Sequence, residues 1–90
     1  MRRAARVDDN QQAIVRDLRM IPGVSVFVSS ALKKFVDLIV GYKGLNWMIE
    51  VKRPSCRKKL TPAQKILHAT WTGKIYVVCT LEEILTIIGI

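Results

Sequence analysis

Two acidic residues and a lysine are the side chains of this sequence best suited to catalysis. Glu50 and Lys52 are separated by one residue in an apolar run, so a strand would project both from the same face. Asp37 stands near the start of the preceding apolar run, and Lys43-Gly44 between the two runs is short enough for a hairpin turn. An antiparallel pair of strands would therefore bring the three side chains together at one end.

Such a group predicts a metal site. Carboxylate oxygens are the ligands that Mg²⁺ and Mn²⁺ prefer, and a lysine beside them can stabilise an anion or orient an attacking water. Metal-assisted cleavage of a phosphodiester bond requires these groups. Each residue also has a simpler interpretation, because Asp37 could form a salt bridge with Lys52 and Glu50 could face solvent from its strand.

The charge of the chain indicates a polyanionic partner. Lys and Arg number 15 against 7 Asp and Glu, which gives a net charge of +8. Charge that serves only to keep a small protein in solution is the alternative, but the basic residues are concentrated directly after the Glu50 strand. Contacts to phosphates position DNA without reading its bases, and no recognition helix is evident. The residues expected to bind DNA in this way are Lys34, Arg53, Arg57, Lys58 and Lys59.

Length and composition predict one small folded domain over residues 1–90, with a frayed basic tail at residues 1–7. Half of the residues are apolar (50%), which favours a folded chain, but a core of this size is marginal. The apolar C-terminal residues could therefore serve an oligomer, or they could cover the sheet of their own chain. The two cysteines, the lack of a signal-peptide core and the lack of a membrane-length apolar run predict a cytoplasmic protein without a membrane partner.

Periodicity and turn signals predict an α/β fold with the order α-β-β-β-α-β-α and a four-stranded mixed sheet flanked by helices. The last strand is nearly all apolar, so it is expected to run parallel to its neighbour and to be buried on both faces. The second helix is expected to turn Ile66, Leu67 and Trp71 towards the core. The expected ranges are helix 9–21, strands 24–29, 35–42 and 46–53, a helix from 61 to 73, strand 74–79 and a helix ending near 88.

These motifs, in this order, resemble the PD-(D/E)XK nuclease superfamily. Three segments, 36–42, 49–52 and 60–64, are similar to the virus-type replication-repair nuclease (VRR-NUC) branch in its small stand-alone phage and bacterial form. The members of that branch have a PDL strand, an EVK strand and an LTPxQ helix start. The corresponding residues here are Val-Asp-Leu, Glu-Val-Lys and Leu-Thr-Pro-Ala-Gln.

The resemblance implies a role for each matched residue. Asp37 and Glu50 would bind the catalytic Mg²⁺ or Mn²⁺, and the backbone carbonyl of Val51 would supply a further ligand. Lys52 would contact the scissile phosphate or the nucleophilic water, with Gln64 beside it. A capping box formed with Thr61 would explain Gln64 without any catalytic role.

Two departures from the family pattern bear on activity. The first helix of the family usually brings a Glu to the metal, whereas the matching residue here is Gln11, which supplies no charge. Asp8 or Asp9 could compensate from a shifted register. The Gly and Pro that precede the family's first aspartate are also missing, since Lys34-Phe35-Val36 precedes Asp37.

Three other residues have functional and structural interpretations. His68 lies one helical turn after Gln64 and could contact a substrate, although a helix-surface position is the simpler explanation. Trp47 and Trp71 could stack on bases, but places in the core are expected for both.

The sequence therefore predicts a metal-dependent DNA endonuclease from a bacterium or a phage-infected cell. The resemblance implies a homodimer acting on branched DNA such as four-way junctions, where two-fold symmetry suits paired incisions. Two alternatives are a catalytically weakened DNA-binding protein on a nuclease fold and a cleavage module that depends on a separate helicase.

Overall fold

The computed structural model describes residues 9–32, 34–56 and 59–90 and confirms the predicted order of elements. Arg57 and Lys58, two of the expected DNA contacts, lie outside the described residues, as does the expected tail at 1–7. No described helix is long and apolar enough to cross a membrane. The elements are α1 (Asp9–Arg19), β1 (Val24–Val28), β2 (Leu38–Tyr42), β3 (Leu45–Val51), a short 3-10 turn η1 (Pro54–Cys56), α2 (Pro62–Thr70), β4 (Ile75–Val78) and α3 (Leu81–Ile88).

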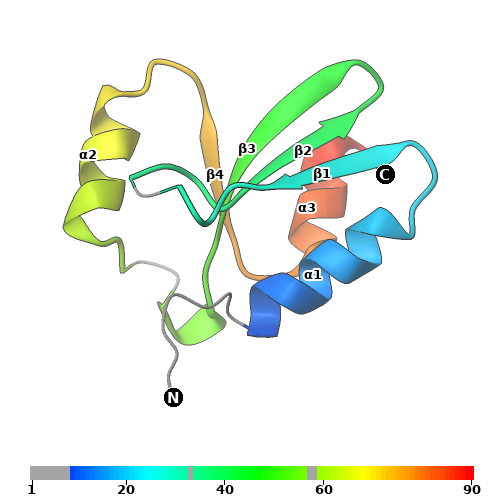
Figure 1. Ribbon diagram of the computed structural model, residues 1–90, viewed down its shortest axis with the longest axis horizontal. Coiled ribbons are helices and arrows are strands. Elements are labelled where there is room, and N and C mark those ends of the chain that lie inside the picture. Colours follow the sequence, from blue (N-terminus) through cyan, green and yellow to red (C-terminus); the bar gives the residue numbers. More distant parts are fainter. Residues whose placement is uncertain (1–8, 33, 57–58) are drawn as a thin grey trace.

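The sheet is mixed, as expected, with four strands in the order β1-β2-β3-β4. The pairs β1–β2 and β2–β3 are antiparallel, while β4 runs parallel to β3. A parallel neighbour requires a crossover, and α2 supplies it. Figure 1 shows α1 and α3 on one side of the sheet and α2 on the other. The fold therefore has three layers, and the third of them is a single short helix.

The hydrophobic core lies between the sheet and the α1–α3 layer. Leu18 on α1, Leu38 on β2 and Ile49 on β3 are completely buried. Burial of a side chain of this size stabilises a fold by roughly 1.5–3 kcal/mol. From α3, Ile84 and Ile88 join the same core, so the apolar C-terminal residues mainly cover their own sheet.

The hairpin between β2 and β3 forms at the predicted turn. Lys43 and Gly44 both have positive φ angles, 50° and 81°. Two consecutive positive φ values define a type I′ turn, whose twist matches that of antiparallel strands. This tight connection sets the register that places Leu38 opposite Ile49.

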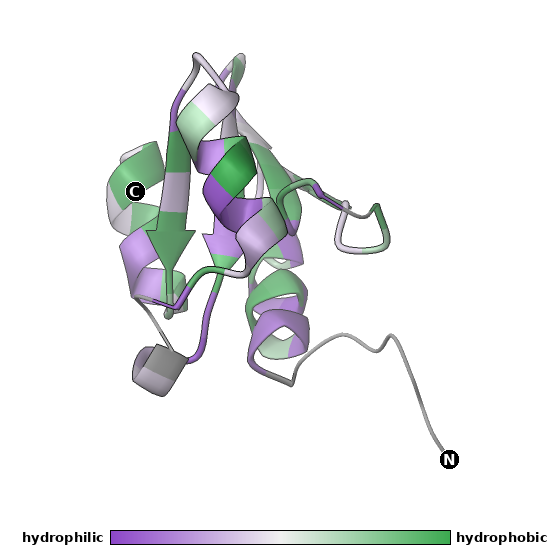
Figure 2. Cartoon of the chain, turned by 90° about the vertical axis from the view of Figure 1, so that its left-hand side faces the viewer, coloured by the Kyte–Doolittle hydropathy of each residue, from purple (hydrophilic) through white to green (hydrophobic). Residues whose placement is uncertain are grey.

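Helix α2 packs less closely against the sheet than the sequence predicts. No residue of α2 is buried. The prediction that its apolar side faces the core is wrong, because Ile66 is 64% exposed and Trp71 is 44% exposed. Figure 2 shows α2 from its outer side, where apolar and polar residues are interspersed. Because α2 covers so little, β4 is buried on both faces only in part, and Val78 is its one fully buried residue. Trp47, in contrast, packs against the core as expected.

Candidate active site

A break in the β2–β3 ladder positions Asp37. The ladder pairs Leu38 with Ile49, and the Asp37 N–H donates to the same Ile49 carbonyl at 3.1 Å. Asp37 and Leu38 thus both lie opposite Ile49, which is the arrangement of a β-bulge. Strand β2 therefore begins at Leu38 rather than at the predicted residue 35. The Val51 N–H is consequently not used by the ladder and donates to the Asp37 carboxylate at 2.9 Å. The bulge therefore aims the carboxylate across the end of β3.

Glu50 and Lys52 are joined through one amide side chain. Gln64 Nε2 donates to Glu50 Oε2 at 2.6 Å, and Gln64 Oε1 accepts from Lys52 Nζ at 2.6 Å. Lys52 has no ion pair with Asp37 in the part of the chain that the structure describes, so the predicted alternative of a salt bridge is not observed. The Gln64 amide therefore lies between the Glu50 carboxyl group and the Lys52 ammonium group and holds both in place.

The start of α2 fixes the position of Gln64. Thr61 is the N-cap, with its side chain accepting from the Gln64 N–H at 3.2 Å, while Gln64 Oε1 accepts from the Thr61 N–H at 2.9 Å. This is the predicted capping box. The same amide oxygen also accepts from Lys52, so Gln64 both caps α2 and contacts Lys52.

Glu50 is a buried acid without full hydrogen bonding. It is 1% exposed, so the alternative of a solvent-facing residue is wrong. Its Oε1 atom is buried without a hydrogen-bond partner among the described residues. Burial, then the charge of neighbouring Asp37 and a hydrogen bond between the two carboxyl groups, raise the pKa of Glu50 to about 8, while Lys52 opposes this shift. A buried carboxyl with an unsatisfied oxygen next to a second carboxyl is electrostatically unfavourable unless a proton or a cation is present.

The donor set fits a hard divalent cation. Asp37 and Glu50 provide oxygen ligands, and the unpartnered Oε1 atom of Glu50 is the acceptor that a cation would satisfy. A third acid is missing, because no cluster of three or more His, Cys, Asp or Glu residues occurs within the described ranges. Two carboxylates favour one cation over a pair.

The start of α1 approaches the site through an asparagine that the sequence analysis passed over. Asn10 Nδ2 donates to the carbonyls of Lys52 at 3.2 Å and of Cys79 at 3.0 Å, which ties α1 to the ends of β3 and β4. Gln11 is 4% exposed and donates to Ser30 Oγ at 3.2 Å. Asp8 and the side chain of Asp9 lie outside the described structure. The only sequence signal for Asn10 is its place in the first turn of a helix.

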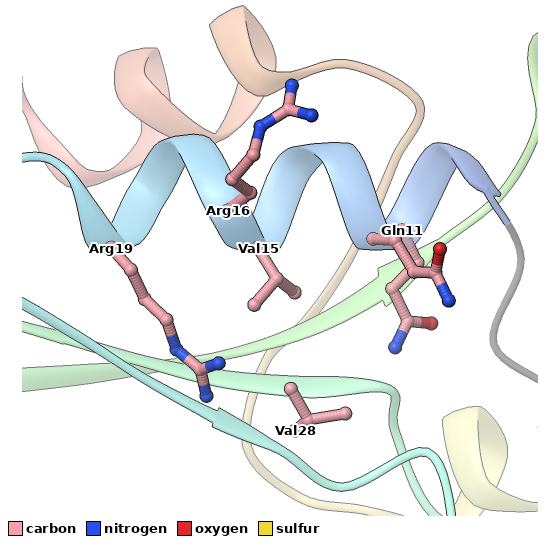
Figure 3. A pocket seen from close by; sticks show the side chains of 6 residues that line it. Gln11, Val15, Arg16, Arg19 and Val28 are labelled. Atoms are coloured by element: carbon pink, nitrogen blue, oxygen red, sulfur yellow. The ribbon is translucent and has the colours of Figure 1, made fainter.

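A separate groove of about 500 Å³ runs between α1 and β1. Figure 3 shows Val15 and Val28 facing each other across it, with Arg19 extending towards β1 and Gln11 at the far end. Arg19 donates to the Val26 carbonyl at 3.1 Å, which covers part of the free edge of β1. The groove does not include Asp37, Glu50 or Lys52, so the carboxylate site lies elsewhere.

The described candidates for DNA contacts are exposed. Lys59 and Arg53 flank the turn that follows β3, and Lys34 precedes the bulge by three residues. His68 is half-buried, so its side chain is only partly on the helix surface, and its Nε2 atom is buried without a partner in the described structure. It lies between Gln64 and Trp71 along α2.

Comparison of this chain with protein-family models, with curated protein sequences and with solved structures found no match. The fold and the site geometry therefore rest on the chain's own residues.

Proposed function

We propose that this protein is a metal-dependent DNA endonuclease of the PD-(D/E)XK superfamily, related to the VRR-NUC branch. The observation that carries the proposal is the hydrogen-bonded group of Glu50, Gln64 and Lys52 beside Asp37, with one oxygen of the buried glutamate unpartnered. Glu50 and Lys52 lie at the end of β3, and Gln64 reaches them from the start of α2. An enzyme that cleaves phosphodiesters with a metal requires these groups in one place.

Asp37 and Glu50 would hold Mg²⁺ or Mn²⁺, and the resemblance adds the Val51 carbonyl. When bound, the cation would polarise the phosphate and lower the pKa of a bound water. The Glu50 carboxyl must lose its proton before it can serve as a ligand, and Lys52 favours that loss.

Lys52 would stabilise the negative charge that develops on the phosphate. Its ammonium group is held at 2.6 Å from Gln64 Oε1, so its position is set before substrate arrives. A preorganised charge requires little rearrangement in the transition state, which is why such groups contribute strongly to rate. Gln64 is thus a positioning residue for both Glu50 and Lys52.

The substrate we propose is branched DNA such as four-way junctions, bound by a homodimer in a bacterial or phage-infected cytoplasm. Lys34, Arg53 and Lys59 would contact the phosphates in the described part of the chain. The apolar C-terminal residues on α3 mainly pack on the sheet of their own chain, so the dimer requires another surface. Sedimentation at micromolar concentration tests it, and a monomer would remove the argument for paired incisions.

Cleavage of labelled four-way junction, flap and linear duplex DNA with Mn²⁺, Mg²⁺ or EDTA tests the activity. Glu50→Gln and Lys52→Ala are expected to reduce cleavage by about 100-fold or more while DNA binding persists. Glu82→Ala removes an exposed carboxylate from α3 and serves as the control. Undiminished cleavage by Lys52→Ala would contradict its role.

A second candidate is a structure-selective DNA-binding protein with a weakened nuclease site. The observation in its favour is the replacement of a third carboxylate by Gln11, which is directed to Ser30. Calorimetric titration with Mn²⁺ separates the two proposals, because the weakened site should bind the ion poorly. Tight junction binding without cleavage under any metal would favour this candidate. Cleavage that appears only on addition of a separate helicase would instead indicate a dependent module.

A further inference from the structure

Trp71 is an exposed aromatic residue that the core does not explain. It is the C-cap of α2 and is 44% exposed, whereas Trp47 packs against the core cluster. An indole combines a large apolar face with a polar N–H, so a half-exposed tryptophan is suited to contact a partner.

The indole is held in one orientation from two sides. Phe35 contacts it edge-on, with ring centroids 6.2 Å apart and planes at 70°. Gly73 passes beneath it so closely that a Cβ atom there would come within 2.8 Å of the indole nitrogen. A side chain at this position would require the indole to shift. Trp71 therefore has two close neighbours, Phe35 and Gly73, while part of the indole stays exposed.

The contact with Phe35 connects this surface to the carboxylate site. Phe35 lies two residues before Asp37, and the β1–β2 connection that contains it reaches across to α2 in Figure 1. Gln64, His68 and Trp71 follow the spacing i, i+4, i+7 that places residues along one side of a helix. At about 1.5 Å per residue, Trp71 lies about 10 Å along α2 from Gln64, which corresponds to about three stacked bases.

We propose that Trp71 stacks on an unpaired base of the DNA strand whose phosphate lies at Glu50. Lys34 next to Phe35 and Lys74 after Gly73 are exposed cations that suit the flanking phosphates. Aromatic stacking tolerates any base, because every base has a π-face. This inference rests on the proposed nuclease function and specifies its substrate: DNA with an unpaired nucleotide within about three positions of the cut.

The test compares binding of fully paired duplex with binding of the same duplex containing a two-nucleotide bulge, in EDTA so that cleavage does not interfere. Trp71→Leu keeps an apolar side chain and removes the aromatic face. It is expected to weaken binding of the bulged DNA by between about 5-fold and about 150-fold and binding of paired duplex by less than about 2-fold. Trp71→Phe should restore most of the loss.

Phe27→Leu is the matched control, because Phe27 is an aromatic residue on β1 with 61% exposure. An equal loss in Phe27→Leu would indicate general aromatic adhesion and overturn the proposal. So would a loss in Trp71→Leu that is the same for paired and bulged DNA, or no loss at all.

A measurement on the unaltered protein avoids any folding defect of the variants. 2-Aminopurine placed at the unpaired position should lose fluorescence on binding, and it should lose less when it is moved into the paired arms. Unchanged fluorescence at the unpaired position would overturn the stacking proposal while leaving the nuclease function intact. Absence of binding to any DNA would instead overturn both.

Discussion

At the scale of single residues, Glu50 is the most informative group, because its environment opposes its charge. The side chain is buried next to Asp37, and its pKa is raised from 4.5 to about 8 by burial first and by the Asp37 charge second. A raised pKa means that the folded protein keeps a proton that the unfolded chain releases above pH 4.5. In the absence of metal, the stability supplied by this group is therefore complete below pH 4.5 and is lost as the pH rises through about 8.

Glu50→Gln tests this linkage directly. The amide is nearly the same size and never ionises, so the variant should gain stability relative to the original protein as the pH rises from 5 to 8 without metal. Urea unfolding at several pH values gives the two free energies of unfolding. A difference between them that stays constant across this range would contradict the raised pKa.

At the scale of elements, the capping boxes of α2 and α3 have the same hydrogen bonds but differ in their further contacts. Thr61 and Gln64 start α2, while Thr80 and Glu83 start α3. Both boxes satisfy backbone groups at a helix start, but only the glutamine also reaches Glu50 and Lys52. The helix start at α2 is thus part of the candidate site, and the start at α3 serves the core.

Paired alanine substitutions separate the two roles. Gln64→Ala and Glu83→Ala should each lower the free energy of unfolding by about 1–2 kcal/mol, because each leaves capping hydrogen bonds unmade. Only Gln64→Ala should also reduce cleavage, by about 10-fold or more, since Glu50 and Lys52 lose their common partner. Thermal unfolding and cleavage rates provide the two measurements. Equal activities of the two variants would show that Gln64 acts only as a cap.

At the scale of the whole molecule, the excess of positive charge bears on the proposed binding of DNA. A net charge of +8 on 90 residues should make such binding sensitive to salt, because each phosphate contact would release counterions. Cations near the site should contribute to this sensitivity more than distant ones. Lys59 is near, following the turn after β3, and Lys43 is distant, at the tip of the β2–β3 hairpin.

Lys59→Ala should therefore weaken binding to every DNA structure alike and reduce the slope of log affinity against log salt by about 0.9. Lys43→Ala removes the same charge from the hairpin tip and should leave the slope nearly unchanged. Fluorescence anisotropy titrations at several salt concentrations give both slopes. Equal slopes for the two variants would show that the charge acts as a general field rather than through contacts.

The sequence by itself determined the order of elements, the mixed sheet, the hairpin turn and the capping box of Gln64. These features depend on local signals, namely periodicity, Lys43-Gly44 and the spacing of Thr61 and Gln64. It also predicted that Asp37, Glu50 and Lys52 would meet, because strand pairing through a short turn leaves little choice of register.

Only the tertiary structure decided the surroundings of those residues. The bulge at Asp37, the buried and unpartnered oxygen of Glu50 and the contact of Asn10 with two strands depend on segments far apart in the chain. Helix periodicity predicted that Trp71 would be buried, but burial depends on whether another layer covers the helix. Here α2 forms an outer layer by itself, so a residue that the pattern assigned to the core lies exposed beside the site.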